Sequence, residues 1–203
     1  MTARRLEAFS DGVFAIIITI MVLELRAPEE PTLAALVPLR PVFLSYVLSF
    51  VNLGIYWNNH HHMIHVTSRV DGAILWANLH LLFWLSLFPF VTAWMGQHFE
   101  AVPTAIYGVV MVMAAIAYVI LQRAILAQEG PGSVLAAAVG RDVKGKISPL
   151  LYVLAIPGAF VNPVIAGALY VTVALIWLVP DRRIQRALDA SDRNDRLPSK
   201  RSS

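Results

Sequence analysis

The chain has 203 residues, of which 58% are hydrophobic and 14% charged, with a formal net charge of +3 and no cysteine. Soluble domains carry roughly 45–50% apolar and about 25% charged residues, so this composition indicates a single membrane body rather than one or two soluble domains. The absence of cysteine excludes a disulfide, a thiolate metal site and a thiol nucleophile.

The first apolar segment resembles a signal peptide in having Arg4 and Arg5 ahead of an apolar run. However, Glu7, Ser10 and Asp11 stand where an uncharged core would begin, and no small-x-small cleavage site follows. We therefore expect a retained first helix.

Six segments are expected to cross the membrane, because a spanning helix needs about 20 mostly apolar residues. The fold class is an all-α membrane protein with one transmembrane domain, residues 1–185, and a polar cytoplasmic tail, residues 186–203. The apolar run after Lys146 is too long for one span, and Asn162-Pro163 is expected to divide it because a residue before proline avoids helical angles. The predicted helices cover residues 6–25, 41–64, 72–95, 103–126, 147–161 and 163–179.

The distribution of Lys and Arg supports this count. With six spans, fourteen of the sixteen cations fall on the side of the two termini, and only Arg26 and Arg40 fall on the other. By the positive-inside rule, both termini are expected in the cytoplasm. Ser133, in the cation-rich segment before the fifth helix, could cap a short amphipathic helix.

Polar residues in the first helix are costly in a membrane and therefore indicate a function or a specific partner. Asp11 lies about one and a half turns inside Arg5, deep enough to need hydrogen-bond partners, and a pair with a histidine of the second helix is physically reasonable. Ile16, Ile20 and Leu23 form one helical stripe. On periodicity alone this stripe could line a pore or serve ordinary lipid or core packing.

The second and third helices carry further polar groups. The second ends in a cluster of histidines, of which His61 and His65 share a helical face, as ligands of helical zinc sites do. In the third helix, Asn78 can donate across helices and Pro89 is expected to produce a kink. No Ser/His/Asp arrangement, phosphate loop or carboxylate pair is evident, so we do not expect an enzyme.

Three sequence blocks resemble the prokaryotic members of the endosomal and lysosomal potassium channel family, the transmembrane protein 175 type. They lie in the expected order within the first half of the chain. The blocks are Arg5-x-x-x-Phe9-Ser10-Asp11-Gly12, Trp57-Asn58-Asn59-His60-His61, and Asp71 to Asn78 continuing to Pro89-Phe90-Val91-Thr92.

The resemblance implies a potassium-preferring cation channel, a homotetramer with the first helix lining a central pore. It implies that Ile16, Ile20 and Leu23 form the apolar constriction and that the Thr19 hydroxyl bears on selectivity. It also implies a structural polar network that holds the first helix against the second and third. The expected members of this network are Arg5, Phe9, Ser10, Asp11, Trp57, His60, His61 and Asn78.

The expected setting is the plasma membrane of a bacterium, with potassium ions and the lipid bilayer as partners and with no cofactor, resident metal or nucleic acid. One alternative is a secondary or proton-coupled cation transporter that uses Asp11 and the second-helix histidines as a relay. Another is a haem or zinc protein built on His60, His61, His62 and His65.

Overall fold

The structure, a computed structural model, describes residues 2–130, 133, 136 and 143–178. The expected cytoplasmic tail and most of the expected amphipathic helix lie outside these residues. The capping hydrogen bond predicted for Ser133 is present, because its hydroxyl accepts from the backbone N of Ala136 at 3.2 Å.

Every regular element among the described residues is helical, which confirms the predicted all-α class. In chain order the elements are α1 (Ala3–Leu23), the 3₁₀ helix η1 (Leu33–Leu39), α2 (Arg40–His65), α3 (Gly72–Ser86), α4 (Phe88–Gln97), α5 (Ala101–Glu129), α7 (Val143–Val161) and α8 (Pro163–Leu178).

Four helical segments of the described chain are long and apolar enough to cross a membrane. They are Ala3–Leu23, Leu33–His65, Gly72–Gln97 and Ala101–Glu129. The two C-terminal apolar helices, Ile147–Val161 and Pro163–Leu178, are shorter. The chain is thus a multi-pass membrane protein.

The third predicted helix, 72–95, is divided in the structure at Leu87 into α3 and α4. Pro89 stands in the first turn of α4. Proline has no N–H to donate, and its ring clashes with the carbonyl four residues earlier, so a helix breaks just before it. The 3₁₀ helix η1, which contains Pro38 and precedes α2, was not predicted.

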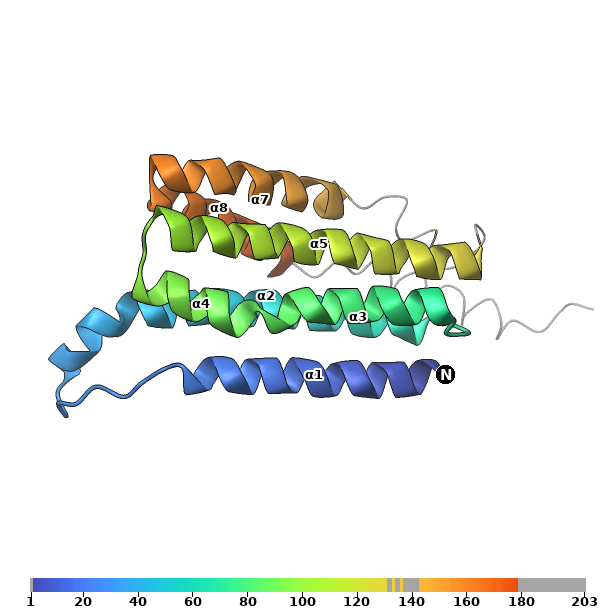
Figure 1. Ribbon diagram of the computed structural model, residues 1–203, viewed down its shortest axis with the longest axis horizontal. Helices are drawn as coiled ribbons and strands as arrows, with labels where there is room; N and C mark the ends of the chain where they lie inside the picture. The colour runs from blue at the N-terminus through green and yellow to red at the C-terminus, as the bar shows by residue number, and fades with distance from the viewer. Residues whose placement is uncertain (1, 131–132, 134–135, 137–142, 179–203) are drawn as a thin grey trace, which may run out of the picture.

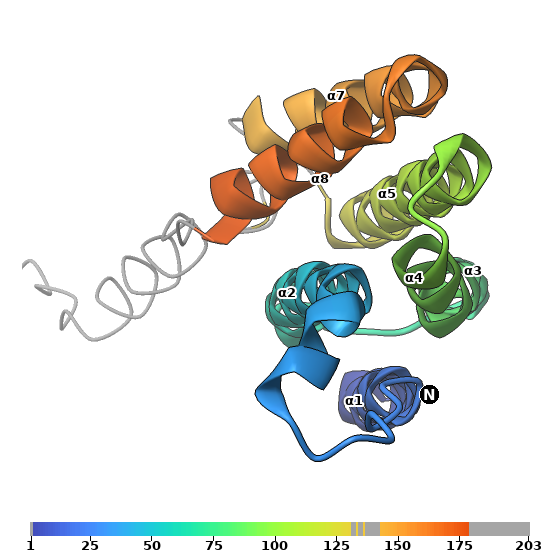
Figure 2. The same ribbon diagram turned by 90° about the vertical axis from the view of Figure 1, so that its left-hand side faces the viewer.

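The helices run up and down one bundle in alternation, except that α4 continues in the direction of α3 (Figure 1). We call one end the His65 end, where α1 begins and α2 finishes, and the other the Arg26 end, which holds the α1–η1 connection. Viewed along the bundle, α1 lies at one edge and α7 and α8 lie at the opposite edge (Figure 2). The first helix packs against α2, α3 and α4.

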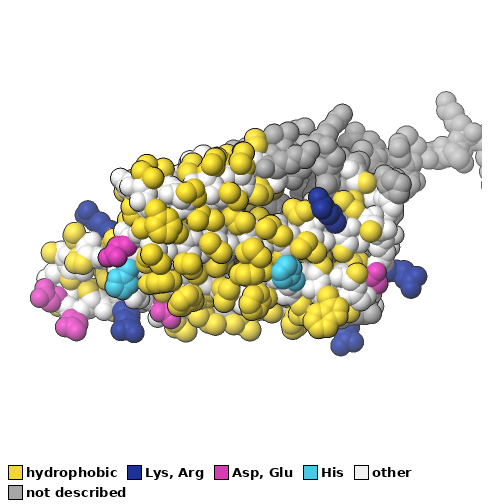
Figure 3. All heavy atoms as spheres, turned by 45° about the horizontal axis from the view of Figure 1, so that its top comes forward, with side chains coloured by type: hydrophobic (Ala, Val, Ile, Leu, Met, Phe, Trp, Pro, Cys, Tyr) yellow, Lys and Arg dark blue, Asp and Glu magenta, His cyan; other side chains and the backbone are white. Residues whose placement is uncertain are grey.

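Charged side chains gather toward the two ends of the bundle, with hydrophobic side chains between them, on the face shown in Figure 3. This separation is what a bilayer requires, because a charge at the centre of the hydrocarbon is costly. The band of exposed apolar side chains includes Phe83 and Phe90.

Candidate functional site

The first helix has two faces of different surroundings. Leu6, Ser10, Phe14, Ile17 and Met21 are buried against the rest of the bundle. Their spacing of three or four residues places them on one side of the helix. The opposite side of α1 is covered by no other described helix, because α1 lies at the edge of the bundle (Figure 2).

The predicted constriction residues lie on this uncovered side. Ile16, Ile20 and Leu23 are 60%, 43% and 74% exposed. In this chain alone the stripe therefore contacts nothing that would seal it from lipid or water. The side of α1 that the resemblance assigns to a pore is the side left open for other molecules.

Thr19 is exposed on the same side of the helix. Its hydroxyl donates to the carbonyl oxygen of Ala15 at 2.8 Å. Because the only hydroxyl hydrogen is used in this bond, the remaining hydrogen-bonding capacity of Oγ1 is that of an acceptor. An acceptor oxygen is the group that interacts favourably with a cation.

Two polar contacts join α1 to α2 in antiparallel register. Glu7 Oε1 lies 2.7 Å from His61 Nδ1, and Asp11 Oδ1 accepts a hydrogen bond from Trp57 Nε1 at 2.9 Å. Asp11 follows Glu7 by four residues in α1, and Trp57 precedes His61 by four residues in α2. The two contacts therefore lie one helical turn apart along both helices. Both helices thus present one polar side chain per turn to the other.

This register corrects the expected partner of Asp11. The structure gives Asp11 the indole of Trp57, and the carboxylate that contacts a second-helix histidine belongs to Glu7. The physical reason is depth: Glu7 lies one turn nearer the His65 end, where the histidines are. Glu7 is the functional candidate that the sequence reasoning missed, although its four-residue spacing from Asp11 was a usable signal.

A second, fully buried chain of hydrogen bonds links three helices. His60 Nε2 lies 2.7 Å from Asn78 Oδ1, Asn78 Nδ2 donates to Ser10 Oγ at 3.0 Å, and Ser10 Oγ donates to the carbonyl oxygen of Leu6 at 2.9 Å. All three side chains are 0% exposed. Since an amide oxygen only accepts, Nε2 of His60 carries the proton.

The other predicted members of the network are placed differently. Arg5 and Phe9 are exposed on α1, away from its buried side. Phe9 precedes the buried Ser10 by one residue, which turns its side chain by about 100° round the helix. The structure therefore brings Ser10, His60 and Asn78 into one chain and Asp11 and Trp57 into one pair, while Arg5 and Phe9 join neither.

The histidine cluster was considered as a metal site. His61 and His65 stack with ring centroids 6.0 Å apart. Among the residues that the structure describes, no three His, Cys, Asp or Glu side chains come together as metal ligands. His60 is instead hydrogen-bonded to Asn78, and His61 contacts Glu7.

A further buried polar cluster at the centre of the bundle was not foreseen. Thr92 Oγ1 donates to Ser49 Oγ at 2.7 Å, and Ser49 Oγ lies 3.1 Å from the hydroxyl of Tyr107. It ties α2, α4 and α5 together, as polar side chains commonly do between membrane helices. Single Ser and Thr residues in apolar helices are common, so the sequence offered little signal for it.

Together these features define a multi-pass α-helical membrane protein whose first helix is anchored by polar contacts on one side and open on the other. The family model of the endosomal/lysosomal potassium channel TMEM175 matches residues 5–89. A potassium channel of Chryseobacterium sp. (strain P1-3) is 55% identical over 189 residues, which cover 93% of this chain and 98% of that protein. The chain belongs to the TMEM175 family of potassium channels.

Other relatives extend this relationship. A potassium channel of Streptomyces collinus is 37% identical over 123 residues, 56% of this chain and 60% of that protein. The human protein named endosomal/lysosomal proton channel TMEM175 is 33% identical over 96 residues, 41% of this chain and 19% of that protein. The crystal structure of a lysosomal potassium-selective channel TMEM175 homolog from Chamaesiphon minutus matches with a TM-score of 0.76 and 26% identity, covering 87% of this chain and 96% of that one.

Proposed function

We propose that the chain assembles as a homotetramer and conducts potassium in preference to sodium through a central pore lined by α1. A central pore needs several copies of one helix around an axis, which a closed symmetric assembly supplies. A helix of 21 residues is about 32 Å long, enough to line the full hydrocarbon thickness of about 30 Å.

The main support for the proposed pore is the side of α1 that no other described helix covers. One side of the helix is buried and fixed by polar contacts to α2 and α3, whereas the stripe of Ile16, Ile20 and Leu23 is exposed. A helix held in this way presents a defined face to whatever lies beside it. The names of the bacterial relatives, which are potassium channels, support ions in a pore rather than lipid as the neighbour of that face.

In the proposed pore, rings of Ile16, Ile20 and Leu23 form the constriction. Narrow apolar rings close by losing water, so the channel can be non-conducting without a moving plug. Thr19, between Ile16 and Ile20 along the helix, contributes one acceptor oxygen per chain beside the constriction. Such a ring of oxygens favours an ion that is partly dehydrated, which bears on the choice between potassium and sodium.

We place the protein in a bacterial plasma membrane with the His65 end in the cytoplasm and all six helical segments crossing the bilayer. Of the cations whose side chains the structure describes, Arg4, Arg5, Arg69 and Arg123 lie toward that end and Arg26 and Arg40 toward the other. This asymmetry is the one that the positive-inside rule requires. The permeant potassium ion is the only ligand that the mechanism needs, and the electrochemical gradient drives it.

The purified protein reconstituted into planar bilayers tests this function. With potassium on one side and sodium on the other, the reversal potential is expected to follow the potassium gradient. A reversal potential that ignores this gradient would contradict the proposal. Because the human relative is named a proton channel, a second recording imposes a pH gradient alone, and a reversal potential set only by protons would also contradict it.

The alternative of a proton-coupled transporter predicts turnover far below the flux of an open pore. The same bilayer recording separates the two, because discrete unitary currents exclude a carrier cycle. The hydrogen bonds of Asp11 to Trp57 and of His60 to Asn78 support a structural role for these two side chains.

A further inference from the structure

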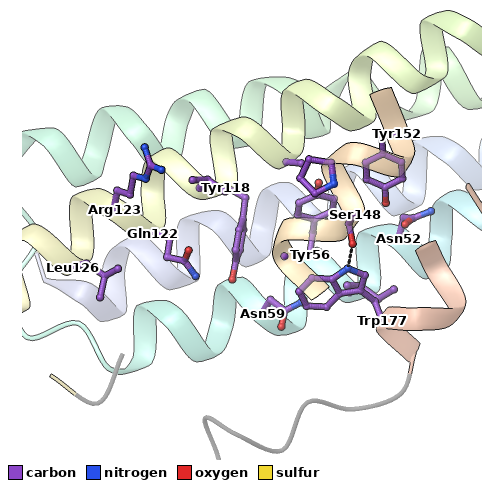
Figure 4. Close-up of a pocket in the computed structure, with 15 residues that line it drawn as sticks. Asn52, Tyr56, Asn59, Tyr118, Gln122, Arg123, Leu126, Ser148, Tyr152 and Trp177 are labelled. Carbon is purple, nitrogen blue, oxygen red and sulfur yellow. Dashed lines mark hydrogen bonds between the residues drawn. The ribbon is translucent and has the colours of Figure 1, made fainter. Parts of the chain in front are cut away.

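A cavity of about 290 Å³ lies inside the bundle between α2, α5, α7 and α8, on the side of α2 remote from α1. Figure 4 shows its labelled side chains. Tyr56 and Asn59 come from α2, Tyr118 and Gln122 from α5, and Trp177 from α8. Ligand pockets have this construction, a mainly apolar wall with a few converging polar groups.

The position of the cavity identifies the part of the membrane that it faces. Gln122 and Arg123 lie near the end of α5, Gly145 near the start of α7, and Trp177 near the end of α8. The end of α5 belongs to the His65 end of the bundle, whereas α8 finishes about midway along it, so the cavity runs from the His65 end toward the middle of the bundle (Figure 1).

The charges of the wall select an anion. Arg123 is exposed at the rim and is the one charged side chain among the fifteen residues that line the cavity, which include no carboxylate. Gly145 of α7 also lies in the wall. Anionic headgroups are drawn to cationic pockets between membrane helices.

The depth of the cavity matches an amphiphile rather than a free anion. Its wall extends along α5 from Ala115 to Leu126, a rise of about 16 Å along the bundle. Apolar side chains such as Ile55 and Val119 line the part farther from the rim, alongside the tyrosines. A ligand that follows this wall has a negative head at Arg123, hydrogen-bond acceptors near the amides and hydroxyls, and an apolar body.

From this arrangement we infer that the cavity is a binding site for an anionic phospholipid of the leaflet at the His65 end. The phosphate lies at Arg123, and the first part of an acyl chain occupies the space beside Ala115. The site is separate from the α1 surface, so its existence does not depend on the proposed ion pathway.

Native mass spectrometry of the full-length protein, titrated with short-chain lipids in detergent, tests this site. Short-chain phosphatidylglycerol is expected to bind about tenfold more tightly than the matching phosphatidylcholine. The reason is that a charge-assisted contact to arginine raises the binding affinity by about tenfold or more. Arg123→Gln should remove this preference. Arg69→Gln, which deletes another exposed cation at the same end of the bundle, should keep it.

A second pair of variants tests the cavity itself without changing charge. Ala115→Trp fills the space and should abolish binding of both lipids. Ala168→Trp, which places the same side chain at an exposed position of α8 outside the cavity, should bind as the wild type does. Retained lipid binding in a folded Ala115→Trp protein would overturn the inference.

Two further results would also overturn it. Equal affinity of the wild type for phosphatidylglycerol and phosphatidylcholine would show that the rim does not select an anion. Displacement of the lipid by glycerol 3-phosphate at the same concentration would show that the site recognises a free phosphate ester instead of a lipid.

Discussion

The indole Nε1 of Trp57 donates a hydrogen bond to Oδ1 of Asp11 over 2.9 Å and joins α2 to α1. One turn nearer the His65 end, His61 and Glu7 repeat the contact between the same two helices. An aspartate within an apolar helix is thus held by a partner from a neighbouring helix. The polar signature of α1 fixes which side of that helix faces the bundle.

Replacement of Trp57 by Phe removes the donor and keeps an aromatic ring. We expect a loss of about 1–2 kcal/mol in the free energy of unfolding, since a hydrogen bond to a charged group is stronger than the usual contact between membrane helices. Denaturation of the purified protein in mixed detergent measures it. Trp76→Phe, at an exposed position of α3, is the control, and an equal loss in both variants would contradict a specific role for Trp57.

Asn78 is expected to be the most sensitive member of the buried chain, because it bonds to both His60 and Ser10. Asn78→Leu leaves two buried polar side chains without their partner, which costs about 2–4 kcal/mol in the free energy of unfolding. The same denaturation assay applies. Asn58→Leu, the same exchange at an exposed position of α2, should have little effect, and comparable stability of the two variants would contradict the network.

The approach of α4 to α2 depends on Gly96. A Cβ at this position would lie 2.8 Å from the backbone Cα of Val42, closer than packed atoms allow. Gly96→Ala should therefore lower stability by about 1–3 kcal/mol, the usual cost of overpacking. At Gly54 a Cβ would have nothing within 4 Å, so Gly54→Ala should be neutral or stabilising in a thermal unfolding measurement; the reverse order would contradict the packing.

The sequence was sufficient to predict most of the helices, because the bilayer demands long apolar runs and concentrates charges at their ends. It did not locate the break at Leu87 or the 3₁₀ helix η1, since proline shows that a helix is disturbed but not where the regular hydrogen bonds resume.

The partners of the polar residues were harder to predict than the residues themselves. The pairing of Asp11 with Trp57 and of Glu7 with His61 depends on the register of two antiparallel helices, which neither helix encodes alone. The uncovered side of α1 was also hidden, because nearly all of its residues are apolar. The burial of Ser10 among apolar residues became visible only in the structure.

The selectivity role proposed for Thr19 predicts a specific effect of Thr19→Val, which removes the acceptor oxygen at nearly constant volume. The potassium-to-sodium permeability ratio should fall about fivefold, if the oxygen contributes the ~1 kcal/mol of one hydrogen bond. Thr172 makes the same hydroxyl-to-carbonyl bond on α8, to Ala168 at 2.7 Å. Thr172→Val is therefore a matched control, and bi-ionic reversal potentials that move equally in both variants would contradict the assignment.

Single-channel conductance of asparagine variants on α1 tests the central claim, that its exposed stripe forms the ion constriction. Ile16→Asn and Leu23→Asn should wet the apolar rings and raise the conductance several-fold, because the barrier there is loss of water. Val22→Asn is the control, since Val22 is also exposed but lies about 100° round the helix from Leu23. The proposal predicts a larger conductance in the two stripe variants and an unchanged one in Val22→Asn, whereas unchanged conductance in both stripe variants would remove this face of α1 from the ion pathway.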